Sequence, residues 1–127
     1  MSFPFNPYQG LVFVDAEVTG PSGIANLQLA LDTGATSSCF NIAPLVGLGY
    51  DPALFPNRVQ VTTGSGVIFV PRIPLIKITA LGQDQKGFPV LAHTLPPSAT
   101  MDGVLGLDFF RGRVLTLDFQ SGQIILV

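Results

Sequence analysis

The sequence predicts an all-β protein with a single domain over residues 1–127. Short apolar runs with partly alternating polar positions recur along the chain, which is typical of β-strands. Turn-forming clusters separate these runs, and the 14 glycines and 11 prolines of the chain suit many tight turns. The length is that of one domain.

The first predicted hairpin leads directly into an acidic residue. Residues 11–18 form its first strand and residues 19–23, which contain two glycines and a proline, form its turn. Residues 24–31 return as the second strand and end at Asp32.

The middle of the chain predicts an irregular stretch followed by a second hairpin. Residues 41–56 are broken by prolines and glycines and have room for one short helical turn. Residues 59–70 predict a hairpin whose tip is Gly64-Ser65-Gly66. The alternative is a plain hairpin loop with no functional part.

The remaining strands are short. Residues 73–78 predict a strand in which Pro74 favours an edge position or an irregularity, because proline donates no hydrogen bond. A polar turn over residues 81–87 precedes a returning strand over residues 88–92.

The C-terminal part predicts one short helix and two strands. Residues 107–112 suit a helix closed by Gly112. Residues 114–119 and 124–127 predict strands on either side of a turn.

The composition predicts a surface for self-association. Hydrophobic residues make up 47% of the chain and charged residues only 11%, which is more apolar area than one small core readily buries. A twofold homodimer is the simplest way to cover that area. The alternative is a compact β protein that carries few charges.

Several partners and locations are not expected. The net charge is −2 and the basic residues are scattered, so no nucleic acid partner is predicted. No apolar run approaches the roughly 20 residues needed to cross a bilayer, so no membrane is predicted either. Residues 1–7 lack the pattern of a signal peptide, and we expect a cytoplasmic location.

The scarcity of other reactive residues restricts the chemistry to aspartate. Cys39 is the only cysteine and is expected to pack in the core, and His93 is the only histidine and is expected to be structural or exposed. One of each cannot assemble a zinc site, so no metal is predicted. Glu17 is the only glutamate, and among the aspartates only Asp32 has a catalytic setting.

Two motifs carry the functional prediction. Asp32-Thr33-Gly34 follows an apolar strand and precedes small residues, so a carboxylate is delivered into a tight loop with little bulk around it. About 70 residues later comes the run 102–110, which contains Val104-Leu105-Gly106. The alternatives are an ordinary turn at Asp32 and a plain core strand at residues 104–106. Asp102 and Asp108 are expected to be solvated or capping residues.

Together, these motifs resemble the retropepsins, the retroviral-type aspartic protease family. The resemblance covers the order and spacing of elements over residues 10–127, and the phrase at residues 106–110 is most similar to the cellular bacterial and eukaryotic relatives. It implies a closed β barrel with one short C-terminal helix that works as a homodimer. It also implies an aspartic endopeptidase with no cofactor, whose partner is a protein or peptide substrate.

The resemblance also implies residue roles. Asp32 and its symmetry mate activate water, the Thr33 hydroxyl locks the two loops together, and Gly34 lies close to substrate. The tip at residues 64–66 is a flap, and the segment 124–127 builds the dimer sheet, which the N-terminal segment can join. The expected substrate-binding residues are Ala35, Thr63, Gly64, Ser65, Gly66, Val104 and Leu105.

The chain departs from the viral members at two positions. They carry an acid two residues after the first motif's glycine and an arginine after the second motif's glycine, whereas Thr36 and Leu107 stand here. The acid and the arginine are expected to be absent together, because either charge buried without the other is costly. Asp108 is a candidate to replace part of this pair by capping the loop.

Two other functions stay open at this stage. The first is a noncatalytic dimeric module that binds an extended peptide by strand addition. The second is a chain that is stable as a monomer and becomes active only with a partner. The intact Asp32-Thr33-Gly34 argues against the first, since a pure binder needs no such carboxylate.

Overall fold

The computed structural model describes residues 1–127. The strands are β1 Ser2–Pro4, β2 Phe13–Gly20, β3 Gly23–Leu31, β4 Cys39–Asn41, β5 Arg58–Thr63, β6 Gly66–Ala80, β7 Gln83–His93, β8 Gly103–Leu105, β9 Leu115–Asp118 and β10 Gln123–Leu126. The helices are α1 Ile42–Gly47 and α2 Leu107–Phe110, with a short 3-10 turn at Pro52–Leu54. Neither helix has the length and apolarity that a membrane-crossing helix requires.

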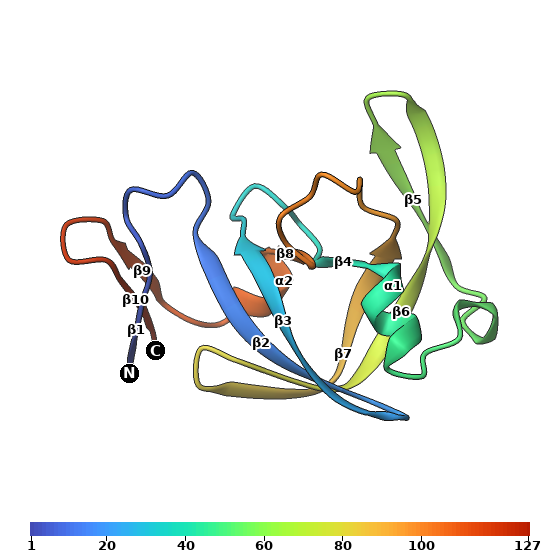
Figure 1. Ribbon diagram of the computed structural model, residues 1–127, viewed down its shortest axis with the longest axis horizontal. Helices are drawn as coiled ribbons and strands as arrows, with labels where there is room; N and C mark the ends of the chain where they lie inside the picture. The colour runs from blue at the N-terminus through green and yellow to red at the C-terminus, as the bar shows by residue number, and fades with distance from the viewer.

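Six strands close into a barrel (Figure 1). Their order is β2-β3-β8-β4-β7-β6, and β6 pairs back onto β2. Strand β5 pairs with β6 outside this ring and forms the long hairpin that projects from the body. The predicted all-β barrel with a short C-terminal helix is therefore confirmed.

The barrel interior is filled by alternate residues of its strands. In β2 the side chains of Val14, Ala16 and Val18 are buried, whereas Asp15 and Glu17 between them are exposed, as the period of two requires. The largest fully buried side chains are Phe40, Phe109, Leu29, Leu45, Ile73, Leu75, Ile78, Leu105 and Ile124. Their burial is the main favourable term in folding.

The second strand of the hairpin predicted at residues 59–70 and the strand predicted at residues 73–78 form one element, β6. Strand β6 runs unbroken through Pro74, pairing with β5 before it and with β2 after it. Around Pro74 the only neighbouring strand is β7, where Pro89 is its partner. Proline is tolerated because this stretch of β6 is locally an edge, as its sequence predicts.

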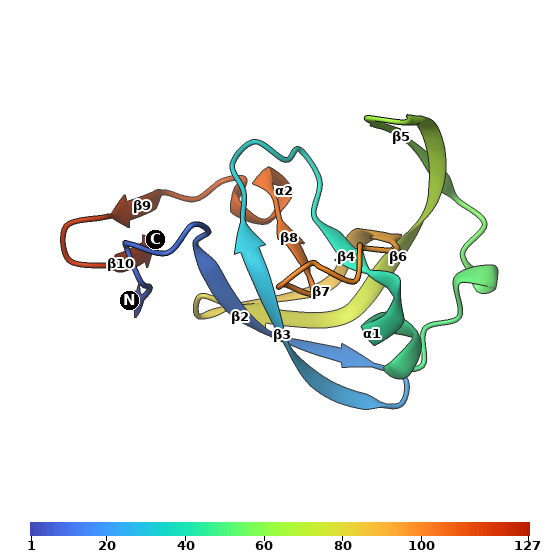
Figure 2. The same cartoon turned by 45° about the horizontal axis from the view of Figure 1, so that its top comes forward.

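The chain ends form a separate three-stranded sheet of order β1-β10-β9. Figures 1 and 2 show this sheet at one end of the molecule, with both termini in it. Ile124 of β10 is fully buried against the barrel core, and Phe3 of β1 packs beside that core. The N-terminal segment thus pairs with the C-terminal strand of its own chain.

Tyr50 ties three parts of the barrel together. Its hydroxyl donates to the Thr19 carbonyl oxygen at the end of β2 and accepts from the Ile76 N–H at 2.8 Å. Ile76 lies in the stretch of β6 that has a strand on one side only, so the hydroxyl stands in for a missing strand. Burial raises the pKa of this hydroxyl, because an ionised phenolate would lose its solvation.

We expect Tyr50→Phe to lower the free energy of unfolding by about 1–3 kcal/mol, since it leaves two main-chain groups without partners. Urea denaturation measures this, with Tyr8→Phe as the control because Tyr8 is 93% exposed. Equal losses in the two variants would contradict the role given to Tyr50.

The same hydroxyl gives an alkaline pH dependence. The folded-state pKa is raised from 10.0, so the unfolded chain ionises first as the pH rises. The stability is therefore complete below pH 10 and falls above it. Tyr50→Phe should flatten this decline in the same denaturation series.

Candidate active site

Asp32 lies immediately after β3, and main-chain contacts fix its position. Its N–H donates to the Leu105 carbonyl oxygen at 3.0 Å, which extends the β3–β8 pairing by one residue. Its Oδ1 accepts from the Gly34 N–H at 2.8 Å, and its carbonyl oxygen accepts from the Ala35 N–H at 3.2 Å. The turn therefore orients the carboxylate locally.

The acid is open to solvent in the single chain. Asp32, Thr33 and Gly34 are all exposed, whereas Ser38 at the other end of the loop is fully buried. Figure 1 shows the loop after β3 on the same edge of the barrel as the loops before β2 and β8 and the β5–β6 hairpin. One face of the carboxylate is thus free for another group.

Strand β8 runs beneath this loop. It pairs in parallel with β3 on one side and antiparallel with β4 on the other, so the loop that joins β3 to β4 must arch over the end of β8. Leu107, just past that end, donates its N–H to the Ala35 carbonyl oxygen at 2.8 Å. The two sequence motifs are therefore in direct contact.

Glycines allow this close passage. A Cβ at Gly106 would lie 2.7 Å from the Ala35 carbonyl oxygen and 3.0 Å from the Ser37 carbonyl carbon. A Cβ at Gly34 would lie 3.1 Å from Asp32 Oδ1. A side chain at position 34 would therefore crowd the Asp32 carboxylate. This requirement for glycine is separate from the close approach to substrate that the resemblance implies.

Ser38 and Asp108 hold the far end of the loop. Asp108 accepts from the Ser38 N–H at 2.9 Å and from its hydroxyl at 2.7 Å, and Ser38 Oγ accepts from the Gly106 N–H at 2.9 Å. All three contacts join the first motif's loop to the second motif. Asp108 therefore caps the loop, as suggested for it from the sequence.

The β5–β6 hairpin has a tip ordered by its own side chains. Thr63 Oγ1 donates to the Gly66 carbonyl oxygen at 3.0 Å and accepts from the Ser65 N–H at 3.3 Å. Along the hairpin, Val59, Val61 and Val70 share the less exposed face. This face belongs to a groove at the base of the hairpin.

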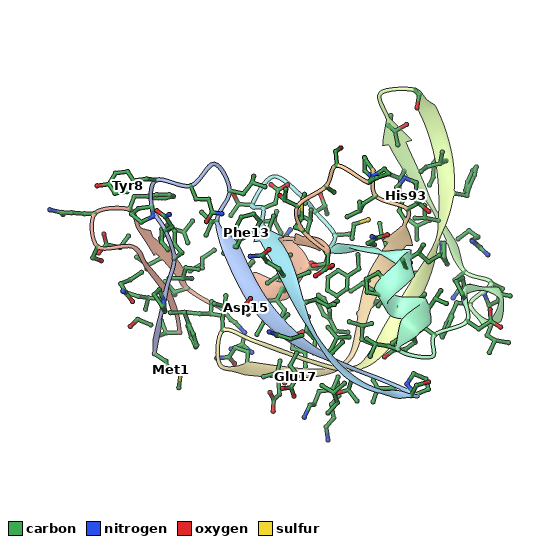
Figure 3. All side chains as sticks on the ribbon, in the orientation of Figure 1. Met1, Tyr8, Phe13, Asp15, Glu17 and His93 are labelled. Atoms are coloured by element: carbon green, nitrogen blue, oxygen red, sulfur yellow. The ribbon has the colours of Figure 1, made fainter.

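The groove has a volume of about 470 Å³, which is within the usual range of ligand sites. It runs between the hairpin, the end of the Asp32 loop and the end of β7. Its lining residues are Thr36, Ser37, Cys39, Val59, Gln60, Val61, Thr62, Val70, Leu91 and His93. Figure 3 shows His93 at the end of β7, below the hairpin.

A comparison with solved structures finds the same architecture. No protein-family model matches the chain, and no curated protein matches it in sequence. The crystal structure of a retropepsin-like aspartic protease from Rickettsia conorii superposes with a TM-score of 0.73 at 18% sequence identity. The match covers 99% of this chain and 88% of that one.

The chain has the retropepsin-like fold. At this identity the likeness establishes the fold alone, and the position of each side chain has to be argued from the geometry above.

Leu105, expected to bind substrate, and Cys39, expected to pack in the core, both have other surroundings in this fold. Leu105 is fully buried, so its side chain is out of reach of a substrate, and its contribution is the carbonyl oxygen that holds Asp32. Cys39 is only half-buried and lines the groove instead of packing in the core. Burial raises the pKa of its thiol, which keeps the thiol protonated and poorly nucleophilic.

The sequence gives little sign of the groove. Its residues meet because the three-residue strand β4 pairs in parallel with the end of β7, which sets Cys39 beside Leu91. Such a short strand has no periodicity to detect, and parallel pairing over long sequence separation has no local signal. The predicted tip residues, Thr63 to Gly66, do lie together on the projecting hairpin.

Ser38→Ala should lower the free energy of unfolding by about 1–3 kcal/mol, because it leaves the buried Gly106 N–H without an acceptor and removes one donor to Asp108. The matched control is Ser37→Ala in the same loop, which should change the stability by less than about 0.5 kcal/mol. Urea denaturation of the two variants decides, and a larger loss in Ser37→Ala would refute the assignment.

Proposed function

We propose that this protein is an aspartic endopeptidase whose active site forms between two copies of the chain. One observation carries the proposal: a retropepsin-like fold presents the Asp32 carboxylate, exposed and oriented by the Gly34 N–H, on the edge that also carries the projecting β5–β6 hairpin. Asp32 is the one acid in this setting, so a second copy must supply the other carboxylate.

The chemistry follows from two carboxylates at hydrogen-bond distance. Two carboxyl groups so close cannot both carry a negative charge, so the pair holds one proton between them. The ionised Asp32 takes a proton from a water molecule as the water oxygen attacks the peptide carbonyl carbon. The protonated Asp32 gives its proton to the carbonyl oxygen, which yields a neutral tetrahedral intermediate.

Collapse of that intermediate completes the reaction. The carboxyl that received the water proton passes a proton to the peptide nitrogen, and the C–N bond breaks. The oxygen that was protonated returns its proton to the other carboxylate as the carbonyl re-forms. The pair is left with one proton, as at the start.

The rest of the site positions the peptide. Thr33 braces one loop against its symmetry mate, and Gly34 and Ala35 offer main-chain groups to the substrate. Residues 63–66 close over the peptide as a flap, which shields the peptide and the attacking water molecule from bulk solvent. The half-buried Val104 and the valine-rich groove favour apolar side chains on the substrate.

A noncatalytic peptide-binding dimer is the second candidate, favoured by the groove beside the projecting hairpin. It predicts binding without cleavage. An assay for peptide cleavage therefore separates the two functions.

Asp32→Asn should reduce cleavage of a diverse peptide mixture between pH 4 and 7 by about 100-fold or more, because the water loses its proton acceptor. The matched control is Asp15→Asn. Asp15 is exposed on the outside of β2, so this variant should cleave peptides like the wild type. Cleavage products are identified by mass spectrometry. If the wild type is dimeric and leaves the peptides uncleaved, the noncatalytic binding module becomes the better assignment.

Dilution should lower the activity per chain, because each active site needs two copies. Initial rates are measured over a concentration series next to sedimentation velocity on the same samples. Adding inactive Asp32→Asn to a fixed amount of wild type should inhibit, since mixed dimers hold one acid. Activity per chain that is constant where sedimentation shows monomers would rule out the shared site.

A further inference from the structure

We propose that His93 selects peptide substrates that place an acidic side chain in the groove at the base of the β5–β6 hairpin. This inference rests on the proposed function, because it takes the groove as part of the peptide-binding site. It names a feature of the substrate, a glutamate whose apolar stem and charged end match two different parts of the groove.

His93 is the one basic side chain that lines this groove. It is the last residue of β7, it is half-buried, and it lies below the hairpin in Figure 3. The catalytic scheme gives it no part, because two carboxylates and a water molecule complete the reaction. A half-buried imidazole in the wall of a groove is placed to contact the molecule that the groove holds.

Strand pairing fixes where His93 lies. Strand β4 pairs in parallel with the end of β7, which sets Asn41 beside His93. Two residues earlier in β7, the Leu91 N–H donates to the Ser38 carbonyl oxygen at 2.9 Å. The end of β7 is therefore held against the loop that carries Asp32.

The groove lining combines an apolar wall with neutral hydrogen-bonding groups. Val59, Val61 and Val70 form the apolar wall along the hairpin, and Ser37 and Gln60 also line the groove. A serine hydroxyl and a glutamine amide can each donate a hydrogen bond to a carboxylate. The two methylene groups of a glutamate suit the valines, and its carboxylate suits His93 and the neutral donors.

No aspartate or glutamate lines the groove, so the lining itself offers His93 no carboxylate. The other charges near the base of the hairpin are also positive. Arg58 begins β5, and Arg72 of β6 is the cross-strand partner of Leu91 in the groove lining. Because the net charge of the whole chain is −2, this group of cations is a local feature that favours an anionic side chain here.

The contact between His93 and a glutamate depends on charge. At about pH 5.5, an ordinary imidazole is mostly protonated and an ordinary glutamate is mostly ionised. A hydrogen bond between two such groups is stronger than one between neutral groups. Glutamine has nearly the same shape without the charge, so a comparison of Glu and Gln peptides isolates this contribution.

Binding constants for matched peptides test the assignment. The peptides have blocked ends and an apolar sequence, and they carry either Glu or Gln at each position in turn. Calorimetry at about pH 5.5 uses the Asp32→Asn protein, which is expected to leave the peptides uncut. We expect the Glu peptide at one position to bind about fivefold more tightly than its Gln counterpart. His93→Gln in the same protein should abolish this difference.

Lys86→Gln is the matched control, because it removes the same charge at an exposed position of β7 that lies outside the groove lining. It should keep the preference for Glu. Loss of the preference in both variants would show that only the net charge matters, and would overturn the assignment. Equal binding of the Glu and Gln peptides at every position, with His93 intact, would overturn it too.

The cleavage rates of the wild type test the proposed function separately. A preference for Glu in binding, with no cleavage by the wild type, would support the role of His93 while the endopeptidase assignment fails. Cleavage by the wild type without any preference for Glu in binding would support the endopeptidase and refute the role of His93.

Discussion

The passage of β8 under the Asp32 loop is the constraint on which the rest of the structure depends. A strand inserted between β3 and β4 forces their connection to cross over its end, and this crossing leaves no room for side chains. A Cβ at Gly103 would lie 2.7 Å from the Cys39 carbonyl oxygen, as tight as at Gly106. The two glycines mark both ends of the crossing, and Asp32 lies at the start of the loop that crosses. Main-chain groups of Gly34, Ala35 and Leu105 hold the acid by hydrogen bonds.

The polar groups in this crossing are satisfied without a charge pair. Ser38 is fully buried, and its hydroxyl both donates to Asp108 and accepts from Gly106, so no buried side-chain polar atom is left without a partner. A carboxylate that accepts two donors from one residue is stabilised by hydrogen bonds instead of an opposite charge. This arrangement is compatible with the uncharged Thr36 and Leu107, where viral retropepsins use an acid and an arginine. The desolvation of a buried ion pair is thereby avoided.

Much of this fold can be predicted from the sequence, and the exceptions have physical causes. The hairpins, the short helix at residues 107–110 and the Asp32 turn have local signals: alternation, glycine-rich turns and an apolar run that ends in an acid. The unbroken β6 has no such signal, because Pro74 by itself predicts a break in the strand. Only the structure shows that β6 has a neighbouring strand on one side alone at this point, where a proline is tolerated. Cys39 was expected in the core because cysteine usually packs there, and only the pairing of β4 with β7 turns it toward the groove. Asp108 could be suspected as a cap, whereas its partner Ser38 could not be named.

The exposure of the acid and the closure of the terminal sheet point to one kind of assembly. A carboxylate in water has no reason to share a proton, and only a second carboxylate brought within hydrogen-bond distance creates a pair that does so. In the proposed enzyme, catalytic competence would then belong to the contact between two chains and not to the single chain. Since each chain completes its own β1-β10-β9 sheet, the contact need not exchange strands, and folding can precede association.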